Sequence, residues 1–307
     1  MNMENLSKFY KVTANEEYLK NPKLIENDVK ELLEWAQDNI KVFGNFMDIQ
    51  IIIFLHACNY NKEYTKKIIR EYFTLRATKC AITFRGRDPF YKHNLKQLDV
   101  IHMHLIKDEN DGFNYFWTSL KIKDASKYYP STAVKLMHMA IELEQIENGT
   151  APGYRVIIDS TDVGFSHAMR FSINNVRNMM IYIQNAIPFV IDKIYVINVT
   201  PGIEKIYTLA KPFMHKSLID KVIMKSVFKT KEFLKSLPQH ILSKDYGGLG
   251  QSMNELTENA KNKLNENREY FIAEELFRNG ILYNDEVETN LPIENESVPT
   301  FKNLCID

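Results

Sequence analysis

The sequence predicts an α/β protein in which an all-helical N-terminal module is followed by a domain with a mostly parallel sheet flanked by helices. Two observations indicate this fold class. In the first third of the chain, apolar residues recur at helical spacing, and from about residue 150 short apolar runs alternate with longer amphipathic segments. Strands that alternate with helices pair in parallel through right-handed crossovers.

The N-terminal module is expected to hold three short helices that pack as a bundle. The first has apolar residues from Leu24 to Trp35 at a spacing close to 3.6 residues. The second covers residues 47–55 and the third covers residues 61–75. The Arg-Gly-Arg-Asp-Pro stretch at 85–89 then interrupts the helical pattern, so the module is expected to end there.

The remaining elements alternate between strand and helix. They are expected, in order, as strands over 100–106 and 115–122, a helix over 131–147, a strand over 156–158, a long helix over 168–187, a strand over 194–199, a helix over 203–211, a strand over 222–224 and a helical segment over 254–279. The chain then divides into a helical module (1–90), a ligand-binding domain (91–250), a C-terminal packing helix (251–283) and an acidic flexible tail (284–307).

Composition excludes several classes of protein. The formal net charge is zero, which gives no electrostatic support for nucleic-acid binding. The three cysteines, Cys58, Cys80 and Cys305, form no CxxC pair, so neither a disulfide framework nor a zinc knuckle is expected. The N-terminal thirty residues lack a signal-like apolar segment, and the longest apolar stretches, such as 51–55, are too short to span a membrane. We therefore expect a cytoplasmic protein.

One local pattern is similar to a hydrolase motif. Gly164-Phe-Ser-His-Ala168 follows a strand and opens a helix, as a nucleophile elbow does. Ser166 is better interpreted as the N-cap of the long helix, with Asp159 and Asp162 near the positive end of its dipole. A Ser, a His and an Asp within one loop also do not readily converge as a triad. An esterase that uses Ser166 is kept only as an alternative, and no catalytic residue is assigned.

Two further patterns carry no cofactor or metal prediction. His102 and His104 alternate on one strand and share a face, but two histidines without a third ligand make a weak metal site. The glycine-rich segment at 247–250 does not follow a strand as a phosphate-binding loop must, and it is interpreted as a turn that allows close packing. We expect neither a cofactor nor a bound metal.

The segment 203–235 indicates contact with a membrane surface. Its first part, 203–214, places apolar residues on one side and Glu204, Lys205 and Lys211 on the other. Over the whole segment, eight lysines stand against three acidic residues, which gives a net charge of +5. A basic amphipathic element in an otherwise neutral chain is typical of reversible attachment to anionic lipid, and each lysine contributes about 1 kcal/mol there.

The order of several short motifs resembles the CRAL-TRIO lipid-binding family, and within it the branch of alpha-tocopherol transfer and cellular retinaldehyde-binding proteins. The motifs lie between about residues 25 and 250: Phe54–Tyr60, Val156–Asp159, Gly164–His167, Ile187-Pro188, Ile194–Asn198, Lys211–Phe213, Leu237-Pro238, Ile241-Leu242 and Tyr246–Gly248. In the first motif, His56 and Cys58 stand where the family usually has Arg.

The resemblance implies a helical module followed by a lipid-binding domain whose sheet is the pocket floor and whose helix over 203–211 is a mobile gate. The implied pocket-lining residues are Tyr154, Ile158, Phe165, Phe171, Met179, Tyr182, Ile183, Ile187, Phe189, Ile191 and Ile194. The implied gate and membrane contacts are Ile206, Leu209, Phe213 and Met214, with Phe165 also exposed to membrane.

The resemblance also implies a basic cleft for anionic lipid or phosphoinositide headgroups. Its implied residues here are Lys67, Lys211, Lys216 and Lys221. Where family members have further basic residues, this chain has Cys58, Val190, Asp192 and Ser217, which weakens the expectation that phosphoinositide is required.

The expected function is to bind a small hydrophobic lipid, such as a retinoid, tocopherol or carotenoid, and to carry it between membranes. The physical problem is desorption: each CH2 contributes about 0.8 kcal/mol, so a twenty-carbon lipid leaves a membrane over a barrier on the order of 15 kcal/mol. The alternative is a lipid-sensing or phosphoinositide-binding module without bulk transfer. The expected partners are the lipid and a transient membrane contact, and no nucleic acid.

Overall fold

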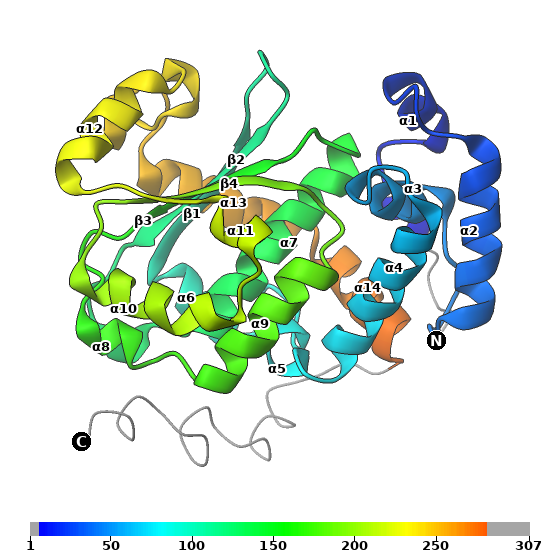
Figure 1. Cartoon of the computed structure of the whole chain (residues 1–307), viewed down its shortest axis with the longest axis horizontal. Coiled ribbons are helices and arrows are strands. Elements are labelled where there is room, and N and C mark those ends of the chain that lie inside the picture. The colour runs from blue at the N-terminus through cyan, green and yellow to red at the C-terminus, as the bar shows by residue number, and fades with distance from the viewer. Residues whose placement is uncertain (1–5, 281–307) are drawn as a thin grey trace.

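The computed structural model describes residues 6–280. The predicted acidic tail over 284–307 lies outside the described residues. The N-terminal part is helical, and its residues up to 77 form one end of the molecule (Figure 1). Its elements are η1 (Leu6–Phe9), α1 (Ala14–Lys20), α2 (Glu26–Asn39), α3 (Asp48–Ala57), α4 (Lys62–Ala77), α5 (Ala81–Phe84) and α6 (Lys92–Leu98). The three expected helices correspond to α2, α3 and α4.

A five-stranded sheet follows, with strands in chain order from one edge to the other. The strands are β1 (Ile101–Lys107), β2 (Asn114–Leu120), β3 (Tyr154–Asp159), β4 (Ile191–Ile197) and β5 (Val222–Met224). Only the β1–β2 pair is antiparallel, and the other three pairs are parallel. The prediction of an α/β fold with a mostly parallel sheet is thus confirmed.

Helices cover both faces of this sheet. The intervening and later elements are η2 (Ala125–Lys127), α7 (Pro130–Asn148), α8 (Phe165–Ala168), α9 (Ile173–Asn185), α10 (Pro201–Ala210), η3 (Lys211–Phe213), α11 (Lys216–Ile219), α12 (Val227–Ser236), η4 (Gln239–Ile241), η5 (Lys244–Tyr246), α13 (Met253–Glu266) and α14 (Arg268–Asn279). We call the face that packs on α7 and α9 the inner face and the opposite face, which packs on α12 and η4, the outer face.

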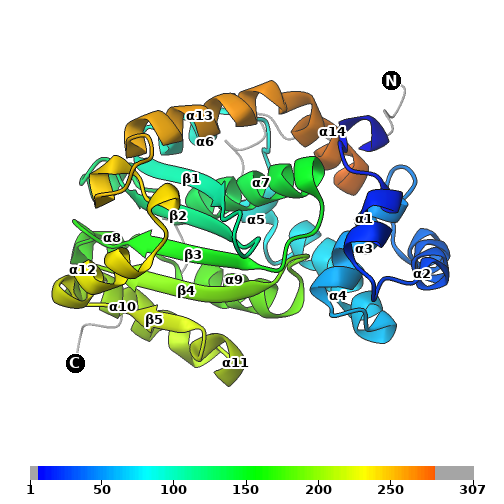
Figure 2. The same cartoon turned by 90° about the horizontal axis from the view of Figure 1, so that it is seen from above.

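Helix α13 lies along the free edge of the sheet, beside β1 (Figure 2). Thr257 of α13 accepts a 3.2 Å hydrogen bond from the backbone nitrogen of Met103 on β1. An uncovered edge strand exposes unpaired backbone groups to other chains. Residue 257 therefore satisfies one such group, and the helix shields the edge.

The prediction of one long helix over 168–187 is wrong, because two helices, α8 and α9, occupy this region. The break lies at 169–172, and Ser172 caps α9 by accepting a hydrogen bond from the backbone nitrogen of Asn175. The predicted cap, Ser166, lies inside α8 and is exposed. A serine side chain competes for backbone hydrogen bonds, so it favours a helix start over a helix interior.

The helical segment predicted over 254–279 is also two helices. Ser252 opens α13 with a capping box formed with Glu255. Asn267 ends α13, where its side chain donates to the carbonyl of Lys263, and it also precedes the first residue of α14. The bend at residue 267 lets α14 turn from the sheet edge toward the N-terminal helices (Figure 2).

Candidate lipid-binding site

The inner face of the sheet carries an apolar floor at the end occupied by β3, β4 and β5. In the strand register, Val156 lies beside Ile194 and Ile194 beside Val222. One step along, Ile158 lies beside Val196 and Val196 beside Met224. The floor residues are Val156, Ile158, Ile194, Val196, Val222 and Met224, and all but Val156 and Val196 remain half-buried. Incomplete burial means that the helices above do not fill this part of the sheet.

Helix α10 lies above this end of the sheet and has an apolar side. Ile203, Ile206, Tyr207 and Leu209 are half-buried, whereas Glu204 and Thr208 are exposed. The helix packs mainly on α8, α9 and η3. Helix α10 thus covers apolar surface without being fully buried in the core.

Both ends of α10 are held to neighbouring elements. At its start, Thr200 caps the helix and donates a 2.7 Å hydrogen bond to the carbonyl of Val163. Gly202 lies so close to this loop that an added Cβ would be 2.4 Å from the Val163 oxygen. Beyond its end, Gln184 of α9 donates to the carbonyl of Phe213 at 2.9 Å and accepts from the nitrogen of His215.

A small cavity, which we call the sheet cavity, lies beneath α8 and α10 and has a volume of about 70 Å³. Of the predicted site residues, it brings together Ile158, Phe171 and Ile206. The lining residues that the sequence analysis did not select are Ile101, Thr118, Ser119, Leu120, Tyr128, Asp159, Val163, His167 and Ile203. Those on β1 and β2 come from strands whose sequence pattern gave no hint of a ligand.

A second cavity, the module cavity, lies between the helical module and the α9–α11 region and has a volume of about 210 Å³. It brings together five predicted residues: Ile183, Ile187, Phe189, Ile191 and Lys221. The others are Ala57, Cys58, Tyr64, Ile68, Gln184, Ala186, Val190, His215, Ser217 and Leu218. The predicted lining set is thus split between two separate cavities.

The remaining predicted residues lie outside both cavities. Tyr154, Met179 and Tyr182 are buried in the core, and Ile194 is a half-buried floor residue. Phe165 is 52% exposed at the start of α8 and does not line either cavity. The predicted gate residues Leu209, Phe213 and Met214 are half-buried.

The four predicted basic residues do not all converge. Lys221 lines the module cavity, and its ammonium donates to the carbonyl of Ile191. Lys67, Lys211 and Lys216 are exposed. In the same cavity, burial raises the pKa of the Cys58 thiol to about 11, so this cysteine remains protonated and unreactive at neutral pH.

A buried ionic cluster between the helical module and α7 was not predicted. Arg76 of α4 pairs with Glu142 of α7 at 2.7 Å, and Arg87 pairs with both Glu142 and Glu274 of α14. Arg278 holds Glu274 at 3.1 Å. Ile68, Tyr72 and Arg76 share one face of α4 at four-residue spacing, so the burial of Arg76 has a sequence signal.

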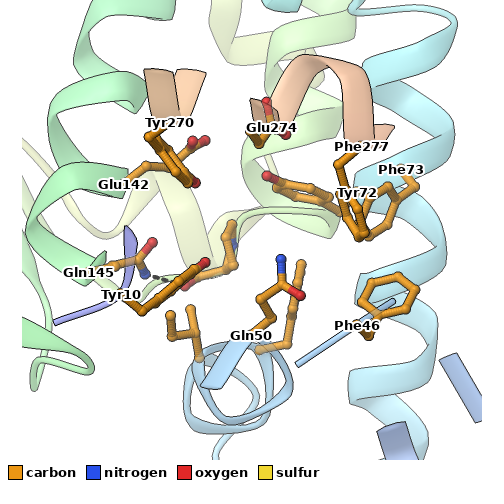
Figure 3. Close-up of a pocket in the computed structure, with 13 residues that line it drawn as sticks. Tyr10, Phe46, Gln50, Tyr72, Phe73, Glu142, Gln145, Tyr270, Glu274 and Phe277 are labelled. Atoms are coloured by element: carbon orange, nitrogen blue, oxygen red, sulfur yellow. Dashed lines mark hydrogen bonds between the residues drawn. The ribbon is translucent and has the colours of Figure 1, made fainter. Parts of the chain in front are cut away.

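A cavity of about 50 Å³ adjoins this cluster (Figure 3). Figure 3 shows Tyr10, Gln50, Glu142, Glu274 and Tyr270 around it, from segments far apart in the sequence. Burial and nearby carboxylates raise the pKa of the Tyr10 hydroxyl, which therefore stays protonated. Its size suits one or two water molecules, which satisfy buried polar groups, rather than an organic ligand.

The local groups considered for catalysis do not form a relay. The imidazole Nδ1 of His167 accepts a 3.1 Å hydrogen bond from the backbone of Gly164. The Asp159 carboxylate accepts from Thr161, Asn198 and Tyr246. These groups are committed to local structure, and Ser166 faces solvent.

The histidine pair and the glycine turn have structural roles. His104 is buried and stacks on Trp117, and His102 meets Thr257 of α13. Gly248 lies against Leu242, whose carbonyl oxygen would be 2.2 Å from an added Cβ, so the prediction of close packing is confirmed. Within residues 6–280, no group of three or more His, Cys, Asp or Glu side chains could hold a metal ion. No helix in the same range is long and apolar enough to cross a membrane.

Comparison with known families identifies the sheet-containing part. Residues 101–248, which hold all five strands and the α8–α10 region, match the CRAL/TRIO domain. This part of the chain is a CRAL/TRIO domain. Residues 21–94 match a different family, described as the Pinta-like UBA domain. The helical module of the chain is therefore UBA-like and precedes the CRAL/TRIO domain.

Other comparisons add little to the CRAL/TRIO assignment. A solved structure titled "Crystal structure of Sfh5" is similar over 83% of this chain and 92% of that chain, with 13% sequence identity and a TM-score of 0.45. A likeness at this level says nothing about ligand or activity. A search of curated proteins finds no match.

Proposed function

We propose that this protein binds a small hydrophobic lipid between the inner face of the sheet and the α9–α10 helices, and carries it between membranes. The CRAL/TRIO domain supports lipid binding at the level of the family. The observation that carries the proposal is the pair of facing, half-buried apolar surfaces: Ile158, Ile194 and Met224 on the floor, and α10 above them.

The size of the sheet cavity implies that α10 moves. Sites for small organic ligands have volumes of about 300–1,000 Å³, whereas the sheet cavity has about 70 Å³. A lipid therefore enters only if the lid is displaced from the floor. The hydrogen bonds of Gln184 to Phe213 and His215 are the contacts that a displacement of the η3 end would break.

Membrane contact supplies the driving force for opening in this proposal. In water, the apolar side of α10 is buried against the domain, because its exposure costs about 25 cal/mol per Å². At a bilayer the same side chains enter a hydrophobic medium, and the cost of opening falls. The closed state is thus stable in solution, and the open state becomes accessible where lipid is exchanged.

The test is transfer of a fluorescent retinoid or tocopherol analogue between vesicles. Leu209→Asp is expected to slow transfer about tenfold or more while equilibrium ligand affinity changes little. Ile206→Asp is the second variant, and because Ile206 lines the sheet cavity it is expected to weaken ligand binding as well as to slow transfer. Thr208→Asp, on the exposed side of the same helix, is the matched control. Wild-type transfer rates in both gate variants would contradict the role of α10. Mass spectrometry of an organic extract tests ligand binding itself, and an extract without lipid would contradict the proposal.

A second function, recognition of an anionic headgroup without bulk transfer, is favoured by one observation. The module cavity is the larger of the two and is lined by Lys221, His215, Ser217 and Gln184. Vesicles that contain phosphoinositide test this: Lys221→Met should weaken binding, while Lys96→Met, distant in sequence, should not. If transfer is absent but Lys221-dependent binding persists, the sensing function is supported over the carrier function.

A further inference from the structure

The first turn of α12 exposes large apolar side chains to solvent. Phe228 is 75% exposed and Val227 is 59% exposed. Both positions lie in an amphipathic helix whose other apolar residues have partners. Phe228 and Val227 therefore form an apolar tip that the fold itself leaves uncovered.

The orientation of Phe228 does not result from a loosely attached helix. Phe233 is buried against the ring of Tyr195 on β4, with ring centroids 4.5 Å apart. Thr230 accepts a 3.0 Å hydrogen bond from the backbone nitrogen of Asn198. Because successive helix residues are about 100° apart, Phe228 lies about 160° from Thr230 and about 140° from Phe233. The anchored side of α12 thus fixes Phe228 on its outer side.

The exposed surface of the helix is mostly basic. Lys229, Lys231 and Lys235 are exposed, and Glu232 is the one acidic residue in α12. An exposed aromatic side chain among lysines matches the chemistry of an anionic bilayer, in which the ring enters the acyl region and the ammonium groups meet lipid headgroups. A protein partner would have to combine an apolar surface with acidic residues around it, whereas an anionic bilayer supplies both features at every point of its surface.

The topology places this tip at the same end of the sheet as the proposed lid, on the opposite face. Helices α8, α10 and α12 each follow a parallel strand, so all three start at the carboxyl edge of the sheet. Both views show them at the same end of the molecule, opposite to α1 and α2 (Figures 1 and 2). Phe165, 52% exposed, is the first residue of α8, as Val227 is the first residue of α12.

We propose that the α12 tip, defined as Val227, Phe228, Lys229, Lys231 and Lys235, docks on an anionic lipid bilayer and turns the carboxyl edge of the sheet, with α10, toward it. This contact goes beyond the proposed function, because it requires neither a bound lipid nor movement of α10. The docking contact rests on the proposed function in one respect only: orienting α10 toward the membrane is useful only if α10 is a lid. Docking and exchange are then separate steps carried by separate helices.

Co-sedimentation with vesicles of phosphatidylcholine and phosphatidylserine tests the proposal. Phe228→Asp is expected to weaken binding about tenfold or more, because an aromatic side chain that enters the bilayer is replaced by a charge. Replacement of Lys229, Lys231 and Lys235 by Gln is expected to abolish the preference for phosphatidylserine, at about fivefold per lysine. Circular dichroism and thermal unfolding should match the wild type, since all four side chains are exposed.

Leu19→Asp is the matched control, because Leu19 is 86% exposed on α1 at the opposite end of the molecule (Figure 1). Unchanged vesicle binding by Phe228→Asp, or an equal loss in Leu19→Asp, would overturn the proposal in favour of a protein partner or no partner. The gate variant Leu209→Asp should still sediment with vesicles. If extracts contain no lipid but sedimentation depends on Phe228, docking stands while the carrier function fails.

Discussion

The guanidinium of Arg76 donates a 2.8 Å hydrogen bond to the hydroxyl of Tyr182, which joins α4 of the helical module to α9 of the CRAL/TRIO domain. Both side chains are fully buried, and Arg76 also pairs with Glu142 of α7. One arginine therefore connects the module to two helices that cover the inner face of the sheet.

Loss of this arginine should destabilise the whole protein. Arg76→Met leaves the Glu142 carboxylate with fewer partners inside the core, and breaking a buried pair in this way costs about 3–5 kcal/mol. Urea unfolding measures the change. Arg70→Met on the same helix is the control: Arg70 is exposed over the Trp35 ring, and its loss should cost less than about 1 kcal/mol. Similar losses of unfolding free energy in both variants would show that the buried ionic cluster contributes no more to stability than an exposed arginine does.

Loosening the η3 end of α10 should speed lipid exchange. Gln184→Ala removes the two hydrogen bonds to Phe213 and His215. Each such bond contributes about 1 kcal/mol, so the exchange rate should rise by about fivefold or more. Asn185→Ala, which removes a bond only to the preceding turn of α9, serves as the comparison in a stopped-flow exchange assay. An unchanged rate in Gln184→Ala would place the hinge elsewhere.

Two glycines near the start of α10 should differ in how much replacement by alanine lowers the free energy of unfolding. In Gly202→Ala, the new Cβ would lie 2.4 Å from the Val163 oxygen, so the loop and the helix must separate. We expect a loss of about 2 kcal/mol, within the range for overpacked sites. In Gly164→Ala, the nearest atom is 3.8 Å away and the backbone is extended, so stability should be nearly unchanged. Thermal unfolding of both variants checks the contrast, which equal melting temperatures would refute.

Acid should lower the free energy of unfolding through the protonation of His104. Burial, and to a lesser degree the neighbouring His102, lowers the pKa of His104 to about 4, whereas an unfolded imidazole titrates near about 6.5. Between these values the unfolded chain binds a proton that the native state excludes. Stability from the neutral ring is therefore fully present above about pH 6.5 and is lost as the pH falls toward 4.

The variant His104→Leu isolates this contribution from that of the other histidines. Between pH 7 and pH 5, the wild type should lose about 2 kcal/mol more of its unfolding free energy than the variant does. Urea unfolding at both pH values provides the comparison. Parallel pH profiles for the two proteins would mean that His104 titrates normally.

Strands β3, β4 and β5 were predictable because each contains a compact apolar run. Strand β3 contains Val156-Ile157-Ile158, and β5 at the parallel edge of the sheet is Val222-Ile223-Met224. Strands of a parallel sheet are covered by helices on both faces, so they are apolar throughout and can be recognised from the sequence alone. The division into α8 and α9 was not predictable in the same way. Residues 169–172 (Met-Arg-Phe-Ser) contain neither Gly nor Pro, so no helix-breaking residue marks the boundary, and the Ser172 cap is what starts α9.

The candidate site was harder to predict than the fold, because a cavity is a property of the space between elements. Ile158 and Ile183 were selected for one pocket, yet they line two different cavities. Thr118 reaches the sheet cavity because β2 pairs with β3 and places it beside Ile158, and Ile101 reaches it from β1, one strand farther away. The ionic cluster depends on Arg87 and Glu274, which are 187 residues apart, so no local pattern could pair them.

The position of α14 has a consequence for the order of folding. Among the residues synthesised before α14, Arg76 and Arg87 share a single buried carboxylate, that of Glu142. The other two carboxylates of this region, Glu274 and Glu275, are synthesised later. During synthesis, which proceeds from the N-terminus at about 5–20 residues per second, the nascent module thus carries unbalanced positive charge. The helical module is expected to complete its core only after the ribosome has translated residue 278, so its final packing follows that of the sheet rather than preceding it.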